Sequence, residues 1–328
     1  MTEGPAPVEV SEGIWLLKLP LPFPVATINV YLVRLAEGYL LVDCGLKTKS
    51  CRKALSGSLS ALGVAFADIR QLVITHVHPD HFGLAAEVRR LSGAQVMMHP
   101  AEAALISSRY LDHEFFSRHS AWLAENGVPA DETEEIAQAS AGVAEFVDMV
   151  EVDRALEDGD RIAVEGGELD VLLAPGHSPG LLTFYFPQRK LYFSSDHMVE
   201  RITPNIGLHS RSSANPLGDY LASLERVRGM DIDCVLPSHG HPFRGHREWI
   251  DATREHHRAR CERMLAAVSS SPRTAYEVVR VEWGSHLSPL NERFAVAETL
   301  AHLEYLRRQG RAEARPENGV VRWMRTSS

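Results

Sequence analysis

The 328-residue sequence has few cysteines, no long apolar run and no excess of positive charge, and each lack excludes a class of protein. Its four cysteines form no CxxC pair, which argues against both a disulfide framework and a thiolate zinc site. No apolar run approaches the roughly 20 residues of a membrane helix, and the acidic N-terminal segment is unlike a signal peptide. We therefore expect a cytoplasmic protein that has no membrane partner.

The composition also excludes disorder and a surface that binds nucleic acid over its whole extent. Apolar residues make up 45% of the chain and charged residues 23%, as in globular proteins. The formal net charge of -9 opposes the binding of a phosphate backbone by the whole surface. The chain also contains 16 histidines, a number that its composition does not explain. Their positions in the sequence are therefore the main guide to function.

The order of the predicted elements indicates an α/β fold. Up to residue 98, short strand-like runs alternate with helical patterns, and further strand-like runs follow between residues 150 and 194. This alternation favours helices that pack against sheets. Between the two parts, residues 100–147 are helical in pattern, and we predict that they form a helical insertion.

A change of charge marks the predicted domain boundary near residue 246. Residues 1–244 carry 20 basic and 32 acidic side chains, or -12, whereas residues 245–328 carry 14 and 11, or +3. The tail has the pattern of three helices and a strand pair, which is the order of a winged helix. We predict a catalytic domain over residues 1–246 and a small winged-helix-like α+β domain over residues 247–328.

The densest group of chemically active side chains is the sequence His76-Val-His78-Pro-Asp80-His81, which follows a predicted buried strand. In an extended chain residues i and i+2 lie on one face, so His76 and His78 converge. Pro79 ends the extended stretch, and the turn brings Asp80 and His81 to the same space from another direction. Imidazole and carboxylate ligands favour zinc, iron or manganese over calcium or magnesium. The segment therefore predicts a metal site.

Three later segments carry further candidate ligands. Each places a histidine or an aspartate directly after a strand-like run, beside glycine, proline or serine: PGHSPG with His177, FSSDHM with Asp196 and LPSHGH with His239. The carboxyl ends of strands are where sites collect in α/β folds. Each segment alone could be an ordinary polar loop, but together they strengthen the prediction of a metal site.

THVHPDHFG, followed in order by PGHSPG, SSDH and SHG, resembles the metallo-β-lactamase superfamily over about residues 10–245. The resemblance implies an αβ/βα sandwich of two mixed sheets flanked by helices. It also implies a pair of metal ions. In that pattern His76, His78 and His177 would hold the first ion, Asp80, His81 and His239 would hold the second, and Asp196 would bridge them.

Two details refine this resemblance. LVDCG is similar to the early aspartate motif of the family, which implies that Asp43 supports the metal ligands from behind. His81, and an aspartate rather than a cysteine at position 196, separate the chain from the antibiotic-destroying lactamases. The family name therefore does not give the substrate.

The ligand set predicts a metal-dependent hydrolase that uses a hydroxide bridging two divalent ions, with zinc favoured and iron or manganese as alternatives. Asp80 is the candidate catalytic residue, because it would orient the bridging solvent and accept its proton. We expect a small ester, thioester or lactone as substrate. The loops and insertions that set specificity in such a fold leave the substrate-binding residues unknown.

Two other activities remain open at this point. One is a single-strand-preferring endoribonuclease whose C-terminal domain aids RNA binding, on account of four arginines in one predicted helix: Arg254, Arg258, Arg260 and Arg263. Glutamates interleave these arginines, so nucleic acid is the less favoured partner. The other activity is that of a mono-iron sulfur dioxygenase, which keeps part of the same motif pattern. The C-terminal domain is also a candidate homodimer interface.

Polar residues near the ligand motifs are weaker candidates for contact with substrate, and an ordinary loop position is the more common role. They are His197, Arg201, Asn205, His209, His241 and His246. The pair His256 and His257 lies within a helical pattern among arginines, where neighbouring side chains diverge. We expect a solvated helix face there.

Overall fold

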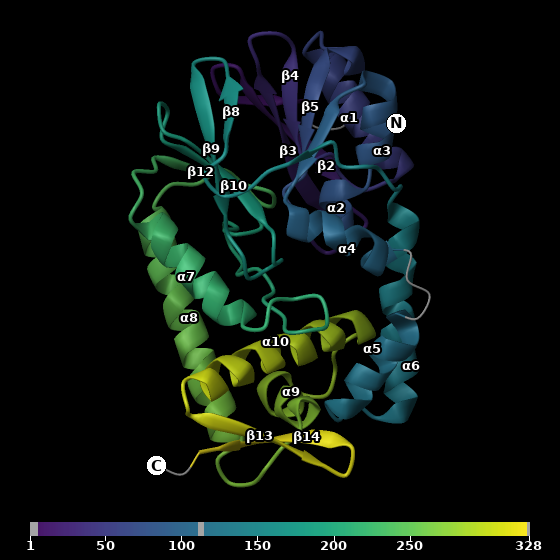
Figure 1. Cartoon of the computed structure of the whole chain (residues 1–328), viewed down its shortest axis with the longest axis vertical. Helices are drawn as coiled ribbons and strands as arrows, with labels where there is room; N and C mark the ends of the chain where they lie inside the picture. The colour runs from purple at the N-terminus through teal and green to yellow at the C-terminus, as the bar shows by residue number, and fades with distance from the viewer. Residues whose placement is uncertain (1–5, 111–114, 327–328) are drawn as a thin grey trace.

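The computed structural model describes residues 6–110 and 115–326, which form two sheets with flanking helices and, beyond them, a mainly helical part (Figure 1). The first sheet has seven strands in sequence order, antiparallel from β1 to β4 and parallel from β4 to β7. Its strands are β1 (Val8–Ser11), β2 (Ile14–Pro20), β3 (Thr27–Arg34), β4 (Tyr39–Val42), β5 (Ile69–Val73), β6 (Gln95–Met98) and β7 (Arg154–Ala155).

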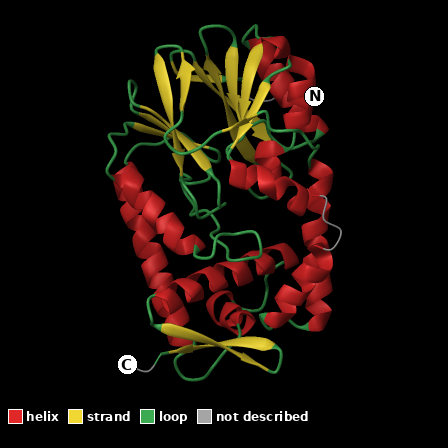
Figure 2. Ribbon diagram, in the orientation of Figure 1, coloured by secondary structure: helices red, strands yellow, loops and turns green. Residues whose placement is uncertain are grey.

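The second sheet is also mixed. Its order is β12-β11-β10-β9-β8, with β11 and β12 parallel and the other neighbours antiparallel. Its strands are β8 (Arg161–Val164), β9 (Gly167–Leu173), β10 (Leu182–Phe186), β11 (Leu191–Ser195) and β12 (Cys234–Pro237). Both sheets lie together at one end of the molecule, flanked by helices (Figure 2).

Strand β2 shows why the two sheets stack. Its side chains alternate between the faces of the sheet, as the period of two in a strand requires. Ile14 and Leu16 join the apolar layer that also contains Phe184 and other residues of the second sheet. Leu17 and Leu19 point the other way, into the cluster beneath the helices that cover the first sheet. One strand therefore contributes to two hydrophobic layers.

The helices of the first part of the chain flank the sheets or extend from them. Those that precede or follow the strands are α1 (Lys49–Ala61), α2 (Pro79–Phe82), α3 (Ala85–Ser92) and α7 (Pro216–Arg228). The helical pattern of residues 100–147 corresponds to α4 (Pro100–Tyr110), α5 (Phe115–Glu125) and α6 (Ala130–Ala141), followed by a 3-10 turn at Gly142–Phe146. That this segment is an insertion stays a prediction.

The last part of the chain consists of three helices and a hairpin, in the order that the sequence predicts. They are α8 (His246–Ala267), α9 (Ala275–Trp283), α10 (Pro289–Arg308), β13 (Ala312–Glu317) and β14 (Val320–Arg325). Helix α10 packs against α6, α7, α8 and α9. A single hydrophobic cluster joins residues of β9, β11, β12 and α7 to these helices. The division at residue 246 and the winged-helix plan stay predictions.

The predicted fold class is confirmed. Two mixed sheets flanked by helices form the metallo-β-lactamase fold, and a small unit with helices and a two-stranded sheet follows. Among the helices of residues 6–110 and 115–326, none combines the length and the apolar character that crossing a bilayer requires.

Candidate metal centre

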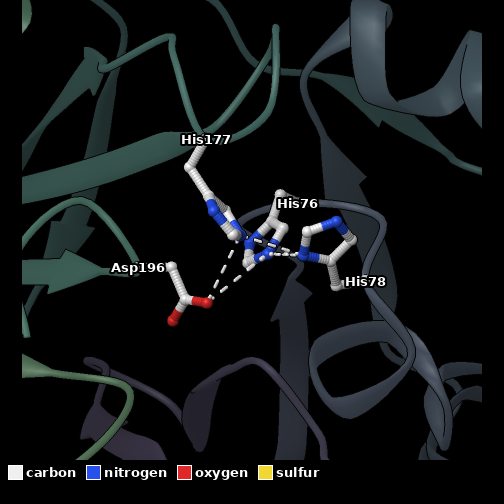
Figure 3. A group of neighbouring side chains, drawn as sticks. All are labelled: His76, His78, His177 and Asp196. Carbon is white, nitrogen blue, oxygen red and sulfur yellow. Dashed lines mark hydrogen bonds and ion pairs between the residues drawn. The ribbon is translucent and has the colours of Figure 1, made fainter. Parts of the chain in front are cut away.

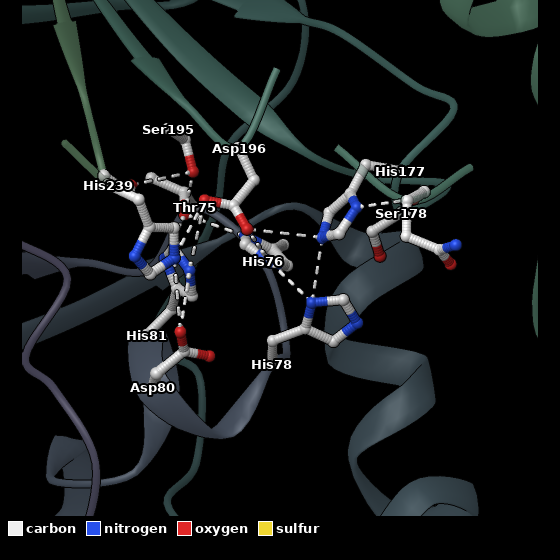
Figure 4. Close-up of polar contacts among 12 residues, drawn as sticks. Thr75, His76, His78, Asp80, His81, His177, Ser178, Ser195, Asp196 and His239 are labelled. Atoms are coloured by element: carbon white, nitrogen blue, oxygen red, sulfur yellow. Dashed lines mark hydrogen bonds and ion pairs between the residues drawn. The ribbon is translucent and has the colours of Figure 1, made fainter. Parts of the chain in front are cut away.

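The candidate ligands come from four loops that follow strands. His76 and His78 lie between β5 and α2, and Asp196 follows β11 directly. His177 lies in the connection from β9 to β10, and His239 follows β12. The loops meet at one end of the two sheets, and their side chains converge there (Figure 4). The structure therefore brings together all seven side chains that the sequence predicts as ligands, because strand ends in a layered sheet structure share an edge.

Four of the side chains form a first ligand group (Figure 3). Nδ1 of His78 lies 2.9 Å from Nε2 of His76 and 3.0 Å from Nε2 of His177. Oδ2 of Asp196 lies 3.4 Å from Nε2 of His177 and 4.0 Å from Nε2 of His76. One atom from each residue lies within 4.8 Å of the others, which is close enough for a single ion to be shared.

The other three predicted ligands form a second group beside the first. Oδ2 of Asp80 lies 3.8 Å from Nε2 of His81 and 3.4 Å from Nε2 of His239. Oδ1 of Asp196 lies 3.5 Å from both of these nitrogens. The two oxygens of Asp196 thus face different groups, and this carboxylate stands between them.

The chemistry of the donor atoms fits a metal. Burial lowers the pKa of His76 and of His78 well below 6.5, and neighbouring basic groups lower it further, so both rings are neutral ligands. Within the described chain, Nε2 of His81 and Oδ1 of Asp196 are buried without a hydrogen-bond partner. Buried polar atoms normally have partners, and a cation in the second group would satisfy both atoms, which lie 3.5 Å apart.

In the second group, the carboxylates of Asp80 and Asp196 lie beside the imidazoles of His81 and His239, and each kind of group stabilises the charged form of the other. Burial acts to raise the pKa of Asp80, but His81 and His239 outweigh it and hold that pKa below its ordinary value. Burial acts to lower the pKa of His239, but Asp196 and Asp80 raise it to about 9. A metal ion would replace protons at such nitrogens, because ligand imidazoles must be deprotonated.

Asp43 lies directly behind the second group. Its Oδ2 accepts a hydrogen bond from Nδ1 of His81 at 2.7 Å, which turns Nε2 of that ring toward the ligands. The same carboxylate accepts bonds from the backbone N–H of Thr75 at 2.8 Å and from its hydroxyl at 2.9 Å. Asp43 is thus placed where the resemblance to the family implies, and the supporting role assigned to it stays a prediction.

Glu102 on α4 joins two ligand loops, and the sequence analysis missed it. This fully buried carboxylate accepts bonds from the backbone N–H groups of Val77 at 2.8 Å and Gly180 at 2.7 Å. It also accepts a bond from the hydroxyl of Ser178. Val77 lies between two ligands, and Ser178 and Gly180 belong to the PGHSPG segment, so one carboxylate fixes both loops. An acidic residue in the first turn of a helix gives no sequence signal of such contacts.

The weaker candidates have different outcomes, and one of them touches a ligand. The backbone carbonyl of Asn205 accepts a hydrogen bond from Nδ1 of His177 at 2.9 Å. His197 is buried and bonds to Tyr192 and Ser223, as a core histidine does. Arg201 and His241 both pair with Glu200, while His246 is buried at the start of α8.

The expectation of a solvated face at His256 and His257 is wrong for His257. That side chain is only 1% exposed, and its Nδ1 lies 3.0 Å from Nε2 of His302 on α10. A polar helix with many arginines is typical of a solvent-facing position, but α10 covers one side of α8.

A group of basic side chains beside the first ligand group was also missed. Arg109 lies at the end of α4, His209 and Arg211 lie in the loop after β11, and Arg293 lies on α10. Burial and the nearby guanidinium groups lower the pKa of Arg211 to about 9 and that of Arg293 to about 10. Among the described residues, neither Arg109 nor Arg293 forms an ion pair with a carboxylate. These residues, which we call the arginine group, are separated in sequence and have no common motif.

Comparison with known families matches both parts of the chain. Residues 24–239 match the model of the metallo-beta-lactamase superfamily, and residues 261–326 match that of the metallo-beta-lactamase-like C-terminal domain. A Bacillus subtilis protein named "Probable metallo-hydrolase YqjP" is 28% identical over 306 residues, which is 90% of this chain and 92% of that protein.

The chain is also similar to a protein with a named activity and to two proteins of known structure. The human "Acyl-coenzyme A thioesterase MBLAC2" is 30% identical over 66% of this chain and 74% of its own length. A metallo-beta-lactamase family protein from Thermus thermophilus has a TM-score of 0.85 and 33% identity, covering 97% of this chain and all of that one. A beta-lactamase domain protein from Burkholderia ambifaria has a TM-score of 0.88 and 28% identity, covering 99% and 96%.

Proposed function

The chain belongs to the metallo-β-lactamase superfamily of metallo-hydrolases, and we propose that it uses two divalent metal ions to hydrolyse thioesters of the acyl-coenzyme A kind. The position of Asp196 carries the proposal of two ions. One oxygen of this carboxylate faces His76 and His177, and the other faces His81 and His239. A carboxylate with an ion on each side is the usual bridge of a two-metal site.

The chain's own residues would hold and orient the reactants. Bound divalent ions would supply Lewis-acid activation of a water and of the thioester carbonyl. Asp80 would help hold an ion in the second group, and its carboxylate, ionised at neutral pH as an ordinary aspartate is, would accept a proton from the attacking water through an oxygen not used for the ion. A thiol leaving group has a pKa of about 8.5, so its departure requires no strong general acid.

The arginine group supports the choice of an anionic substrate. Coenzyme A carries phosphates, and guanidinium groups bind phosphate through paired hydrogen bonds. Arg109 lies close enough to His76 and His78 to lower the pKa of both. A bound phosphate or carboxylate would relieve the repulsion between Arg109 and Arg293. The name of the human relative, acyl-coenzyme A thioesterase, is consistent with this substrate class.

The ion pairs on α8 favour a small-molecule substrate over RNA. Arg254 pairs with Glu225, and Arg260 pairs with Glu298. Arg258 and Arg263 are paired as well, with glutamates at 2.6 and 2.5 Å. Because these charges are compensated within the protein, they contribute little to an electrostatic surface for a phosphate backbone.

A substrate panel tests the proposal. The protein, loaded with zinc, manganese or iron and analysed for metal content, is assayed with short- and long-chain acyl-coenzyme A, simple esters and lactones. We expect thiol release from acyl-coenzyme A, loss of that activity in Asp196→Asn, and a KM about 10-fold higher in Arg293→Ala. Protein with two ions per chain that hydrolyses none of the thioesters would refute the proposal, whereas one iron per chain and oxygen consumption with a persulfide would indicate a sulfur dioxygenase.

A further inference from the structure

The loop between β11 and α7 connects a metal ligand to the C-terminal part of the chain. It begins at Asp196 and runs between the sheets and α10 (Figure 1). We infer that α10 positions His177 through this loop: Glu298 holds Asn205, and the carbonyl of Asn205 orients the imidazole. The inference rests on the proposed metal site, and it gives the C-terminal part of the chain a role in metal binding.

The first link fixes the ring of His177. Its Nδ1 donates to the carbonyl of Asn205 at 2.9 Å, so this nitrogen carries a proton. Nε2 then presents its lone pair to the first ligand group, where it lies 3.0 Å from Nδ1 of His78. A hydrogen bond of this kind sets both the tautomer and the angle of a ligand histidine.

The second link holds the loop on α10. Nδ2 of Asn205 donates to Oε2 of Glu298 at 3.1 Å, and the N–H of Leu208 donates to the carbonyl of Ala297 at 2.9 Å. Between these bonds the backbone approaches α10 so closely that a Cβ on Gly207 would lie 3.0 Å from Cβ of Ala297. The loop is therefore bonded to α10 at Asn205 and at Leu208, on either side of the close contact at Gly207. These bonds fix the position of the Asn205 carbonyl, which orients His177.

The third link holds Glu298 itself. Its carboxylate pairs with Arg260 of α8, and both side chains are only 15% exposed. Arg260 also lies over the ring of Trp283, at 5.2 Å from the centroid. Glu298 is thus a fixed acceptor, because a largely buried pair cannot change partners as freely as a surface pair does.

The second ligand group is oriented by other residues and serves as an internal reference. Nδ1 of His81 donates to Asp43, and Nδ1 of His239 donates to the carbonyl of Thr27 at 3.0 Å. These partners belong to the first sheet and its loops rather than to α10. A change at Asn205 or Glu298 is therefore expected to weaken one ion and to spare the other.

Metal affinity measured without substrate tests the inference. We compare Asn205→Ala and Glu298→Ala with the unchanged protein by competition with a chromophoric chelator and by the absorption bands of bound Co²⁺. Loss of a partner behind a ligand typically costs 10- to 100-fold in affinity. We expect that loss for one of the two ions in both variants, together with altered Co²⁺ bands. Glu298→Gln keeps an acceptor for Asn205 and should restore most of the affinity.

Glu132→Ala is the matched control. It removes contacts between α6 and α9, with Tyr276 and Arg280, but does not touch the loop on α10. Wild-type affinity for both ions in Asn205→Ala and Glu298→Ala would overturn the inference. So would an equal weakening of both ions, or the same loss in Glu132→Ala, because either result would indicate general destabilisation. Thioesterase activity enters none of these measurements, so failure of the proposed substrate class would be seen separately.

Discussion

Asp43, at the scale of a single residue, accepts a hydrogen bond from Nδ1 of the candidate ligand His81, which leaves Nε2 of that ring to face the candidate site. In Asp43→Asn the amide cannot accept both from Nδ1 of His81 and from the two donors of Thr75. We expect the affinity of the second ligand group for its ion to fall about 10- to 100-fold. Chelator competition measures the change.

The inferred role of Asn205 gives this variant a cross-check. Asp43→Asn and Asn205→Ala should each lower most strongly the affinity for a different ion, because Asp43 holds His81 of the second group and the Asn205 carbonyl holds His177 of the first. An Asp43→Asn protein that binds both ions as tightly as the wild type would remove Asp43 from the metal centre.

The contacts of Glu102 lead to a second prediction at the scale of a residue, which concerns the free energy of unfolding. In Glu102→Gln an NH₂ group replaces one oxygen and faces N–H donors of Val77 or Gly180. We expect the free energy of unfolding to fall by about 3 kcal/mol, because buried donors lose a charged acceptor. Urea unfolding measures the loss, and Glu125→Gln, at an exposed position on α5, should change it by less than about 0.5 kcal/mol. Equal effects of the two changes would contradict this account.

The sequence predicts best the positions of residues that belong to one short segment of the chain. His76 and His78 share a short motif after a strand, so alternation along the chain is enough to place them on one side. Glu102 and Arg109 act through contacts with loops far away in the sequence, and no short-range pattern encodes those contacts. The convergence of the candidate ligands could therefore be predicted from the sequence, whereas the residues that hold and surround them could not.

At the scale of elements, the contact between α8 and α10 contains two buried histidines. His302 donates from Nδ1 to the carbonyl of Glu298 at 2.7 Å, so its Nε2 is the acceptor for Nδ1 of His257. Burial lowers the pKa of His257 to about 2 and that of His302 to about 3. Both rings are therefore neutral in the folded protein throughout the mildly acidic range.

This pair predicts a loss of stability in acid. In the unfolded chain both histidines take up protons below a pH of about 6.5, whereas in the folded chain they do not, so stability falls as the pH decreases from 7. Each ring contributes about 2 kcal/mol of this loss between pH 7 and pH 5. In His257→Gln the pH dependence of urea unfolding over that range should be smaller by about this amount. An unchanged dependence would show that His257 can be protonated in the folded state.

Helix α8 also shows why helix faces were harder to predict than helix positions. The sequence predicts that Arg254, Arg258, Arg260 and Arg263 lie in one helix, and α8 (His246–Ala267) contains all four. It did not reveal that α10, some 40 residues further along, covers His257. Which side of a polar helix is buried depends on a partner that the local sequence does not contain.

At the scale of the whole molecule, one hydrophobic cluster links the second sheet to the C-terminal helices. Leu303 on α10 is fully buried in this cluster, together with Tyr192 of β11 and Val235 of β12. We expect Leu303→Ala to lower the free energy of unfolding by about 3 kcal/mol. Hydrogen exchange should show reduced protection of β11 as well as of α10. A loss confined to α8–α10 would show that the two parts of the chain unfold independently.

The hydrogen bond between Asn205 and Glu298 has a consequence for the order of events during synthesis. The two residues are 93 positions apart, and His177 precedes both of them. When the ligand loops first leave the ribosome, the helix that secures the carbonyl behind His177 has not yet been made. From the inferred role of α10, we expect the first ligand group to reach its final geometry only after this helix has emerged, so that tight binding of an ion would be a late step in the maturation of the protein.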